Sequence, residues 1–306
     1  MNRLGLHRFS VLLAAATLFL VVAGATVVSK GAGLSVPDWP LSYGKVMPEM
    51  TGGVFYEHGH RMIATAVGFL TVVLAVWLFV VEDRRWMKML GLAAVVAVIL
   101  QGVLGGLTVL FLLPKAVSIG HACLAQAFFS LTVAMAVFTS PEWRKGPQIV
   151  EDRGTPSLRS LAVMAPLSVL AQIALGAAYR HKAFGIVPHV VWAFGVMIAV
   201  MMLGVFALTQ FEQHRPLRRW SIVVLVLTSA QLILGIGAYL ARVLSDTSPN
   251  LGSWMVGTTV AHVALGALVL GATTALSMQV LRHVITVRGE AGAGAPGSFA
   301  PSGRSV

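Results

Sequence analysis

The chain has 306 residues, of which 57% are hydrophobic and 11% are charged. Soluble domains usually carry about a quarter charged residues, so this composition excludes an ordinary soluble protein. The net charge of +11 does not indicate nucleic-acid binding, because the basic residues separate apolar runs and form no stripe interleaved with aromatic residues. A single cysteine, Cys123, excludes an intrachain disulfide and a thiolate metal cluster.

Long apolar runs follow one another along the chain. A run of about 20 apolar residues crosses a bilayer as a helix, and such runs are too long for barrel strands. We therefore predict an all-α integral membrane protein with eight transmembrane helices. The predicted spans are 8–28, 57–80, 88–110, 117–138, 159–179, 186–209, 219–241 and 254–280.

The first span has a second interpretation. Arg3 and Arg8, the apolar run and Ala23-Gly24-Ala25 together resemble a secretory signal peptide. Its apolar run is about 20 residues long, whereas a signal core usually has about 7–15. We therefore expect this span to be retained as a membrane helix.

Basic residues are distributed unequally between the two sides of the predicted bundle. Of the 22 lysines and arginines, 15 lie on the side that holds both termini and 7 on the other. The positive-inside rule then places both termini in the cytoplasm. The segment 29–56 is the one substantial outer loop, and its glycines and prolines favour turns. The Gly-, Ala-, Ser- and Pro-rich segment 288–306 is predicted to be a disordered cytoplasmic tail.

An internal repeat organises the spans. A Gln-x-x-Leu-Gly motif begins at Gln101, Gln172 and Gln231, in the third, fifth and seventh spans. Each of these spans is followed by one with a histidine near its outer end, and the first hairpin supplies a histidine without the glutamine motif. The repeat predicts two pseudo-symmetric four-helix bundles, 1–140 and 155–285.

Four of the nine histidines fall inside the predicted spans, about one or two turns below the outer surface: His60, His121, His189 and His262. Polar side chains at this depth are costly without partners, so they are functional candidates. One isolated histidine can simply hydrogen-bond to a neighbouring helix. Four at one depth, one in each hairpin, favour ligation of haem iron by neutral imidazole. Zinc is disfavoured, because no cysteine or carboxylate joins the second pair.

The repeat makes His60 and His121 one natural ligand pair, and His189 and His262 the other. No Cys-x-x-Cys-His motif is present, so any haem is expected to be noncovalent. Glu57 shares a helix face with His60 and Arg61. Glu57 either complements the helix dipole or has a functional role, handling protons or positioning substrate. Arg61 either contacts a haem propionate or extends to the membrane interface.

These motifs resemble the haem A synthases of the Cox15/CtaA family. The resemblance covers about residues 8–280, continuing through His189 and His262 in the second half. Its specific part consists of Gly31-x-Gly33-Leu34-Ser35-x-Pro37-Asp38-Trp39-Pro40-Leu41, Glu57-x-x-His60-Arg61, and Gln101-Gly102-x-Leu104-Gly105-Gly106-Leu107-Thr108-Val109 followed by His121.

The resemblance implies that the C8 methyl of haem O is oxidised, in successive steps, to the formyl group of haem A for terminal oxidases. It implies a haem b cofactor held by His189 and His262, and substrate haem O bound at His60 and His121 with Glu57 as the catalytically important acid. It further implies a bacterial cell membrane, with the haem sites toward the outer face. Haem O synthase and an electron donor become candidate partners, and the sequence leaves an oligomer open.

One departure from the family concerns the outer loop. Many bacterial relatives carry a cysteine pair there, where this chain has Ser35 and Ser42. We therefore expect a cysteine-free branch without a thiol relay. The alternative function is a dihaem b-type membrane electron carrier, which would use the same four histidines, and a transporter with structural histidines comes third. Glu57 and the outer loop favour the enzyme, because electron transfer between bis-histidine haems needs neither.

Overall fold

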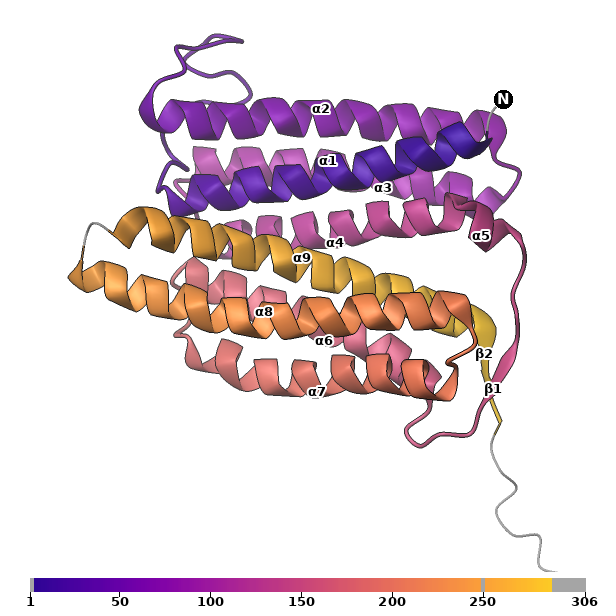
Figure 1. Ribbon diagram of the computed structural model, residues 1–306. Coiled ribbons are helices and arrows are strands. Elements are labelled where there is room, and N and C mark those ends of the chain that lie inside the picture. Colours follow the sequence, from indigo (N-terminus) through magenta and orange to yellow (C-terminus); the bar gives the residue numbers. More distant parts are fainter. Residues whose placement is uncertain (1–2, 249–250, 288–306) are drawn as a thin grey trace, which may run out of the picture.

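A computed structural model describes residues 3–248 and 251–287. Eight long helices run back and forth along one axis (Figure 1). They are α1 (Arg3–Ser29), α2 (Gly52–Val81), α3 (Arg85–Leu110), α4 (Lys115–Thr139), α6 (Leu158–Arg180), α7 (Val187–Gln210), α8 (Arg215–Thr247) and α9 (Gly252–His283). All eight are long and apolar enough to cross a membrane, which confirms the predicted all-α, eight-span membrane protein. The predicted tail 288–306 lies outside the described residues.

Prolines mark the starts of several helices. Pro114 precedes α4, while Pro188 and Pro216 occupy the first turns of α7 and α8. A proline suits a first helical turn, because its missing N–H would have no intrahelical partner there. The helix ends differ from the predicted ones by a few residues, most clearly for α2, which begins at Gly52, and α8, which continues to Thr247.

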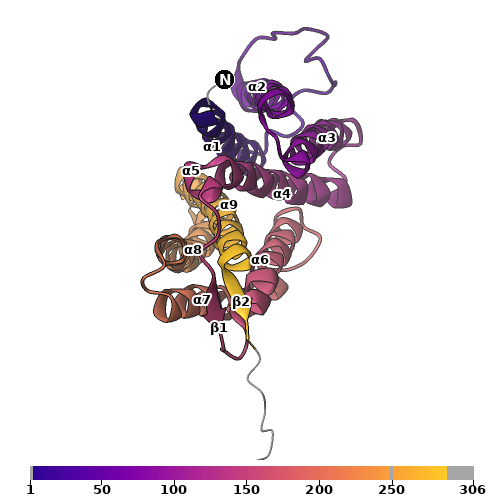
Figure 2. The same ribbon diagram turned by 90° about the vertical axis from the view of Figure 1, so that its right-hand side faces the viewer.

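The helices contact one another in two groups of four. In the first, α1 and α3 each contact both α2 and α4; in the second, α6 and α8 each contact both α7 and α9. The view along the helices separates the two groups, with α9 packed against α1 and α4 between them (Figure 2). The groups follow the predicted division 1–140 and 155–285 in chain order, while the pseudo-symmetry and independence of the two domains stay predictions.

Apolar side chains form a core within each group and a third cluster between them. The bridging cluster has Val21 of α1, Phe129 of α4 and Ala267 of α9 at its centre. Gly271 of α9 admits the Phe129 ring, because a Cβ there would lie 3.0 Å from Phe129 Cε1. Close packing of this kind is how helices associate where no hydrophobic effect drives them together.

A short parallel strand pair was not predicted from the sequence. After α5 (Pro141–Arg144), β1 (Val150–Asp152) pairs with β2 (Val284–Thr286), so the linker between the groups lies beside the end of α9. The buried Asp152 carboxylate accepts hydrogen bonds from the N–H groups of Leu158, at 2.6 Å, and Gly154, at 2.8 Å. The bond from Leu158 satisfies a donor at the start of α6, which no intrahelical carbonyl reaches.

Candidate functional site

The four predicted histidines lie on four different helices and come together in two pairs. His60 of α2 and His121 of α4 lie near each other in the first group. His189 of α7 and His262 of α9 lie near each other in the second group, with ring centroids 6.3 Å apart. The pairs are therefore the two that the repeat predicts.

A glutamine from the preceding helix contacts three of these histidines. The Nε2 atom of Gln101 donates to the backbone oxygen of His121 at 3.0 Å and lies 3.5 Å from its imidazole Nε2. Gln172 makes the same two contacts with His189, at 2.9 and 3.4 Å, and Gln231 with His262, at 3.1 and 3.5 Å. The repeated motif thus fixes the helix that carries each histidine.

The glycine of each motif makes room for the imidazole ring. A Cβ on Gly105 would lie 3.2 Å from Cε1 of His121, one on Gly176 3.0 Å from His189, and one on Gly235 2.9 Å from His262. A Cβ at Gly235 would force the His262 ring to move, and one at Gly105 or Gly176 would press the ring by a few tenths of an ångström.

Gly24 completes the pattern, although it was not among the predicted site residues. It lies on α1, where a Cβ would be 3.0 Å from Cε1 of His60. Leu20 occupies the position of the glutamine, four residues earlier, so the first hairpin keeps the glycine and lacks the amide. No constant spacing marks it in the sequence, because the four glycine-to-histidine separations, 36, 16, 13 and 27 residues, all differ.

The depth of the histidines along their helices is less uniform than predicted. His60, His121 and His262 lie beyond the first turn of their helices, whereas His189 is the third residue of α7. The α8–α9 hairpin extends past the end of the α6–α7 hairpin (Figure 1), so residues at a similar level lie at different distances from their helix starts.

Glu57 is buried, with 4% of its surface exposed, and its two carboxylate oxygens have different partners. Oε2 accepts the backbone N–H of Val36 at 2.9 Å, and Oε1 accepts Nη2 of Arg61 at 2.7 Å. The first contact joins α2 to the outer loop, and the second forms an i,i+4 ion pair on the helix. Glu57 therefore links the helix that carries His60 to the loop above it.

Arg61 also contacts the outer loop, through the terminal guanidinium nitrogen that does not bond to Glu57. Nη1 donates to the backbone oxygens of Asp38 and Leu41, both at 2.8 Å, and to Ser42 Oγ at 3.3 Å. Ser42 is fully buried and also contacts His58 Nδ1 at 2.8 Å. A contact of Arg61 with a haem propionate stays a prediction, and the contacts in the structure give this residue a role in the loop.

The outer loop has a defined shape. Asp38 accepts the N–H groups of Tyr43 and Gly44, at 2.7 and 2.8 Å, across a tight turn in which both residues have left-handed φ angles. These two N–H groups lower the pKa of Asp38 below its usual value. A Cβ on Gly106 of α3 would collide with Trp39, so the Trp39 ring lies directly against Gly106, the residue that follows Gly105 of the motif. The loop thus reaches from α2 to the helix that faces His121.

The second pair lies under much shorter connections. Residues 181–186 join α6 to α7, and 248–251 join α8 to α9, so neither resembles the loop 29–56 in length. Arg180, at the end of α6, donates to the backbone oxygen of Ala25 at 2.6 Å and to Ser29 Oγ at 2.5 Å on α1. This end of the second group is therefore tied to the first.

The distance between the rings of the second pair is compatible with two ligands of one metal ion. The ring centroids of His189 and His262 are 6.3 Å apart, with the ring planes at 81°. A metal–imidazole nitrogen bond is about 2 Å long and a ring centre lies about 1 Å further, so two rings on opposite sides of one metal are about 6 Å apart. The Nδ1 atoms of His60, His121 and His262 are buried without a hydrogen-bond partner.

The number of ligands favours haem over a bare metal ion. No group of three or more His, Cys, Asp or Glu side chains is placed to hold a metal within residues 3–248 and 251–287. Structural and catalytic zinc sites use three or four protein ligands, whereas haem iron needs only axial ones from the protein. Two imidazoles, each seated against a glycine, are a donor set compatible with the axial ligands of a haem.

Comparisons with known proteins agree with this geometry. The sequence profile of the COX15-CtaA family, described as cytochrome oxidase assembly protein, matches residues 7–188. The match includes His60 and His121 and ends just before His189, so it is shorter than the range 8–280 expected for the resemblance.

Three curated relatives are each named heme A synthase. The protein from Alkalihalophilus pseudofirmus is 29% identical over 45% of this chain and 47% of its own length, and that from Symbiobacterium thermophilum is 31% identical over 55% and 56%. The Exiguobacterium protein is 24% identical over 71% of this chain and 80% of its own length. The aligned part thus spans about half the length of the first relative. Because the profile matches more than half of the chain, this membrane protein belongs to the COX15-CtaA family of cytochrome oxidase assembly proteins.

Proposed function

We propose that the chain is a haem A synthase, a membrane oxidoreductase that converts the C8 methyl of haem O to the formyl group of haem A. The observation that carries this proposal is the difference between the two histidine pairs. Within the part of the chain that the structure describes, only the pair of His60 and His121 has a buried carboxylate on the same helix face, that of Glu57, and a packed loop above it. The names of the curated relatives support the same reaction.

The second pair is the proposed site of a noncovalent haem b cofactor, with His189 and His262 as its axial ligands. When bound, haem b supplies one-electron redox chemistry. The protein supplies the orientation: Gly176 and Gly235 make room for the two rings, while Gln172 and Gln231 hold their helices. Such contacts around the ligands of a metal usually determine ring orientation.

In the first group, His60 and His121 would bind the iron of haem O, the substrate. Glu57 would act beside it as the catalytically important acid, and it also holds Val36 of the covering loop and Arg61 of its own helix. Trp39, packed against Gly106, would limit the entry of water from the outer side. Excluding water strengthens every electrostatic interaction at a reacting centre.

The proposed orientation follows from charge. The side that holds both termini carries 15 of the 22 lysines and arginines and is assigned to the cytoplasm, so both haem sites lie toward the outer face of a bacterial cell membrane. Haem O is apolar and long-tailed, so we propose entry from the bilayer. Haem O synthase and an electron donor are the proposed partners.

The test is co-expression with a haem O synthase, followed by haem extraction, mass analysis and a reduced-minus-oxidised spectrum. We expect haem A, or its hydroxylated precursor, from the intact protein. Glu57→Ala should lose product and keep haem b, whereas His262→Ala should lose haem b. Haem b with haem O left unchanged would contradict the synthase.

That last result would instead support a dihaem b-type electron carrier. One observation favours this second candidate: the glycine beside the imidazole recurs at all four histidines, as it would if both pairs held haem in the same way. A carrier would have no use for Glu57 or the outer loop. The Glu57→Ala variant would then keep full haem content and full electron transfer.

A further inference from the structure

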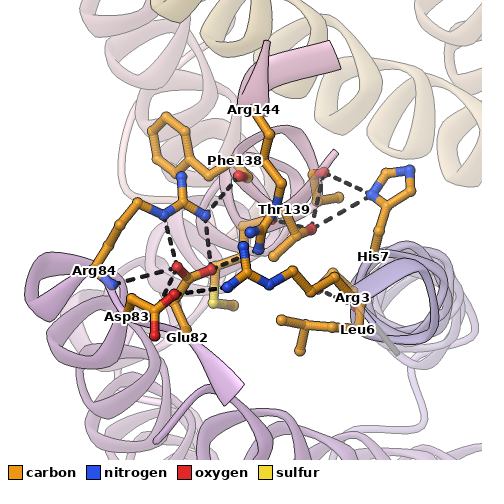
Figure 3. Close-up of polar contacts among 12 residues, drawn as sticks. Arg3, Leu6, His7, Glu82, Asp83, Arg84, Phe138, Thr139 and Arg144 are labelled. Carbon is orange, nitrogen blue, oxygen red and sulfur yellow. Dashed lines mark hydrogen bonds and ion pairs between the residues drawn. The ribbon is translucent and has the colours of Figure 1, made fainter. Parts of the chain in front are cut away.

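A cavity of about 380 Å³ lies at the end of the bundle opposite the histidine pairs. Residues from both helix groups line it, including four arginines and two acids: Arg3, Arg84, Arg144, Arg282, Glu82 and Asp83. Figure 3 shows the guanidinium groups of Arg3, Arg84 and Arg144 gathered around the carboxylates of Glu82 and Asp83. Four positive and two negative side chains leave the cavity with a net charge of +2.

Glu82 orients two of these arginines. Its buried carboxylate accepts Nε and Nη2 of Arg84, at 2.9 and 2.8 Å, and Nη2 of Arg144 at 2.8 Å. The hydrogen bond from Arg84 is the main reason why the pKa of Glu82 falls to about 2. Glu82 is therefore ionised at any physiological pH, and it holds two guanidinium groups with a single negative charge.

Arg282 adds a cation that no acid neutralises. Among the described residues, no carboxylate forms an ion pair with it. Its guanidinium instead lies over the Trp143 ring, 4.0 Å from the centroid, and Arg84 repels it electrostatically. Nε of Arg144 is also buried without a hydrogen-bond partner. Repelling guanidiniums and an unused buried donor around one cavity favour the binding of an anion.

The position of the cavity identifies the class of anion. It lies at the helix ends on the more basic side, and Trp86 and Trp143 line it. Tryptophans concentrate at the level of lipid headgroups, and basic pockets between transmembrane helices on the cytoplasmic side bind anionic headgroups. We propose that this cavity binds the phosphate group of an anionic phospholipid, with Arg84, Arg144 and Arg282 as its donors.

Binding would join the two helix groups at this end. Arg84 follows α2, and Arg282 lies in the last turn of α9, so one phosphate would neutralise cations from both groups. The inference concerns lipid binding alone and does not depend on the proposed reaction.

The test is native mass spectrometry of the purified full chain, titrated with phosphatidylglycerol or with phosphatidylcholine. We expect preferential binding of phosphatidylglycerol to the wild-type protein. One arginine near a membrane surface contributes about 1 kcal/mol, so Arg282→Gln should weaken that binding about fivefold. Arg219→Gln is the matched control, because Arg219 also lies near a tryptophan, Trp220, and does not line this cavity.

Three outcomes would overturn the proposal. The first is equal binding of the two lipids by the wild-type protein, a comparison that needs no variant. The second is equal weakening by Arg282→Gln and Arg219→Gln, with lipid-free thermal unfolding showing both variants folded. The third is full competition by millimolar inorganic phosphate, which would assign the cavity to a soluble anion.

Discussion

The two histidine pairs share one way of holding an imidazole and differ in what surrounds it. Each of the four rings lies against a glycine on the neighbouring helix, and three of the four helices are also fixed by a glutamine. Only the first pair has Glu57 and the loop 29–56 beside it. A repeated scaffold can therefore hold imidazoles in both helix groups, while Glu57 and the outer loop are additions to one copy.

The largest effect on product formation is expected from a change at Glu57, which lies beside the first histidine pair and has no counterpart described beside the second. Glu57→Gln keeps the shape of the side chain and removes its charge, so product formation should fall about 100-fold, as for the loss of a catalytic acid or base. Haem b content should not change, because the second pair lies in the other helix group. Extracted haems, analysed by mass, give both quantities. Glu49→Gln, in the same loop and exposed, is the control. Equal activity of the two variants would make Glu57 a structural residue only.

The next prediction concerns the glycine that lies against each imidazole, a feature that both histidine pairs share. Gly235→Ala places a Cβ 2.9 Å from His262 Cε1, and the ring must move. Displacing a metal ligand through its surroundings costs about tenfold or more in affinity, so haem b content should fall by that factor. Gly237→Ala, in the same helix with nothing within 4 Å of its Cβ, should keep haem b. In the first group, Gly105→Ala should reduce product but not haem b, with Gly102→Ala as its control.

A smaller effect on product formation is expected from a substitution in the outer loop 29–56. Trp39→Ala removes the ring that packs on Gly106, and a loss of about 1 kcal/mol of positioning corresponds to about fivefold slower product formation. Trp254→Ala removes an exposed tryptophan near the start of α9 and should change neither haem b nor rate. A rate for Trp39→Ala equal to that of the wild type would show that the loop does not serve the site.

The smallest effect concerns the turn within the loop. Because the pKa of Asp38 is lowered on folding, its contribution to stability is present above the usual value of 3.8 and is lost as the pH falls through the lowered pKa. Asp38→Asn should therefore speed amide exchange at Tyr43 and Gly44 at pH 7. At a pH below the lowered pKa, the variant and the wild type should exchange alike. Hydrogen–deuterium exchange of peptides covering 38–45 measures this, and a difference that is equal at both pH values would contradict it.

The sequence was sufficient for the membrane architecture. Apolar run length alone predicts eight spans, because in lipid every backbone group must bond within its own helix. The Gln-x-x-Leu-Gly repeat also predicts which histidines lie together, since consecutive antiparallel helices are neighbours. The assignment of ligand and catalytic roles to His60, His121, His189, His262 and Glu57 stays a prediction.

Only the tertiary structure shows that the glutamine and the glycine of each repeat contact the histidine on the next helix. Gly24 and His60 are far apart in the chain, and nothing local marks Gly24 as the counterpart of Gly105. The partners of Arg61 are loop carbonyls whose positions depend on how residues 29–56 fold back over α2 and α3. Likewise, the basic cavity forms only because α9 ends beside the α2–α3 connection. Periodicity and charge determine where a helix lies in a membrane, whereas contacts between helices and loops depend on packing between segments distant in sequence.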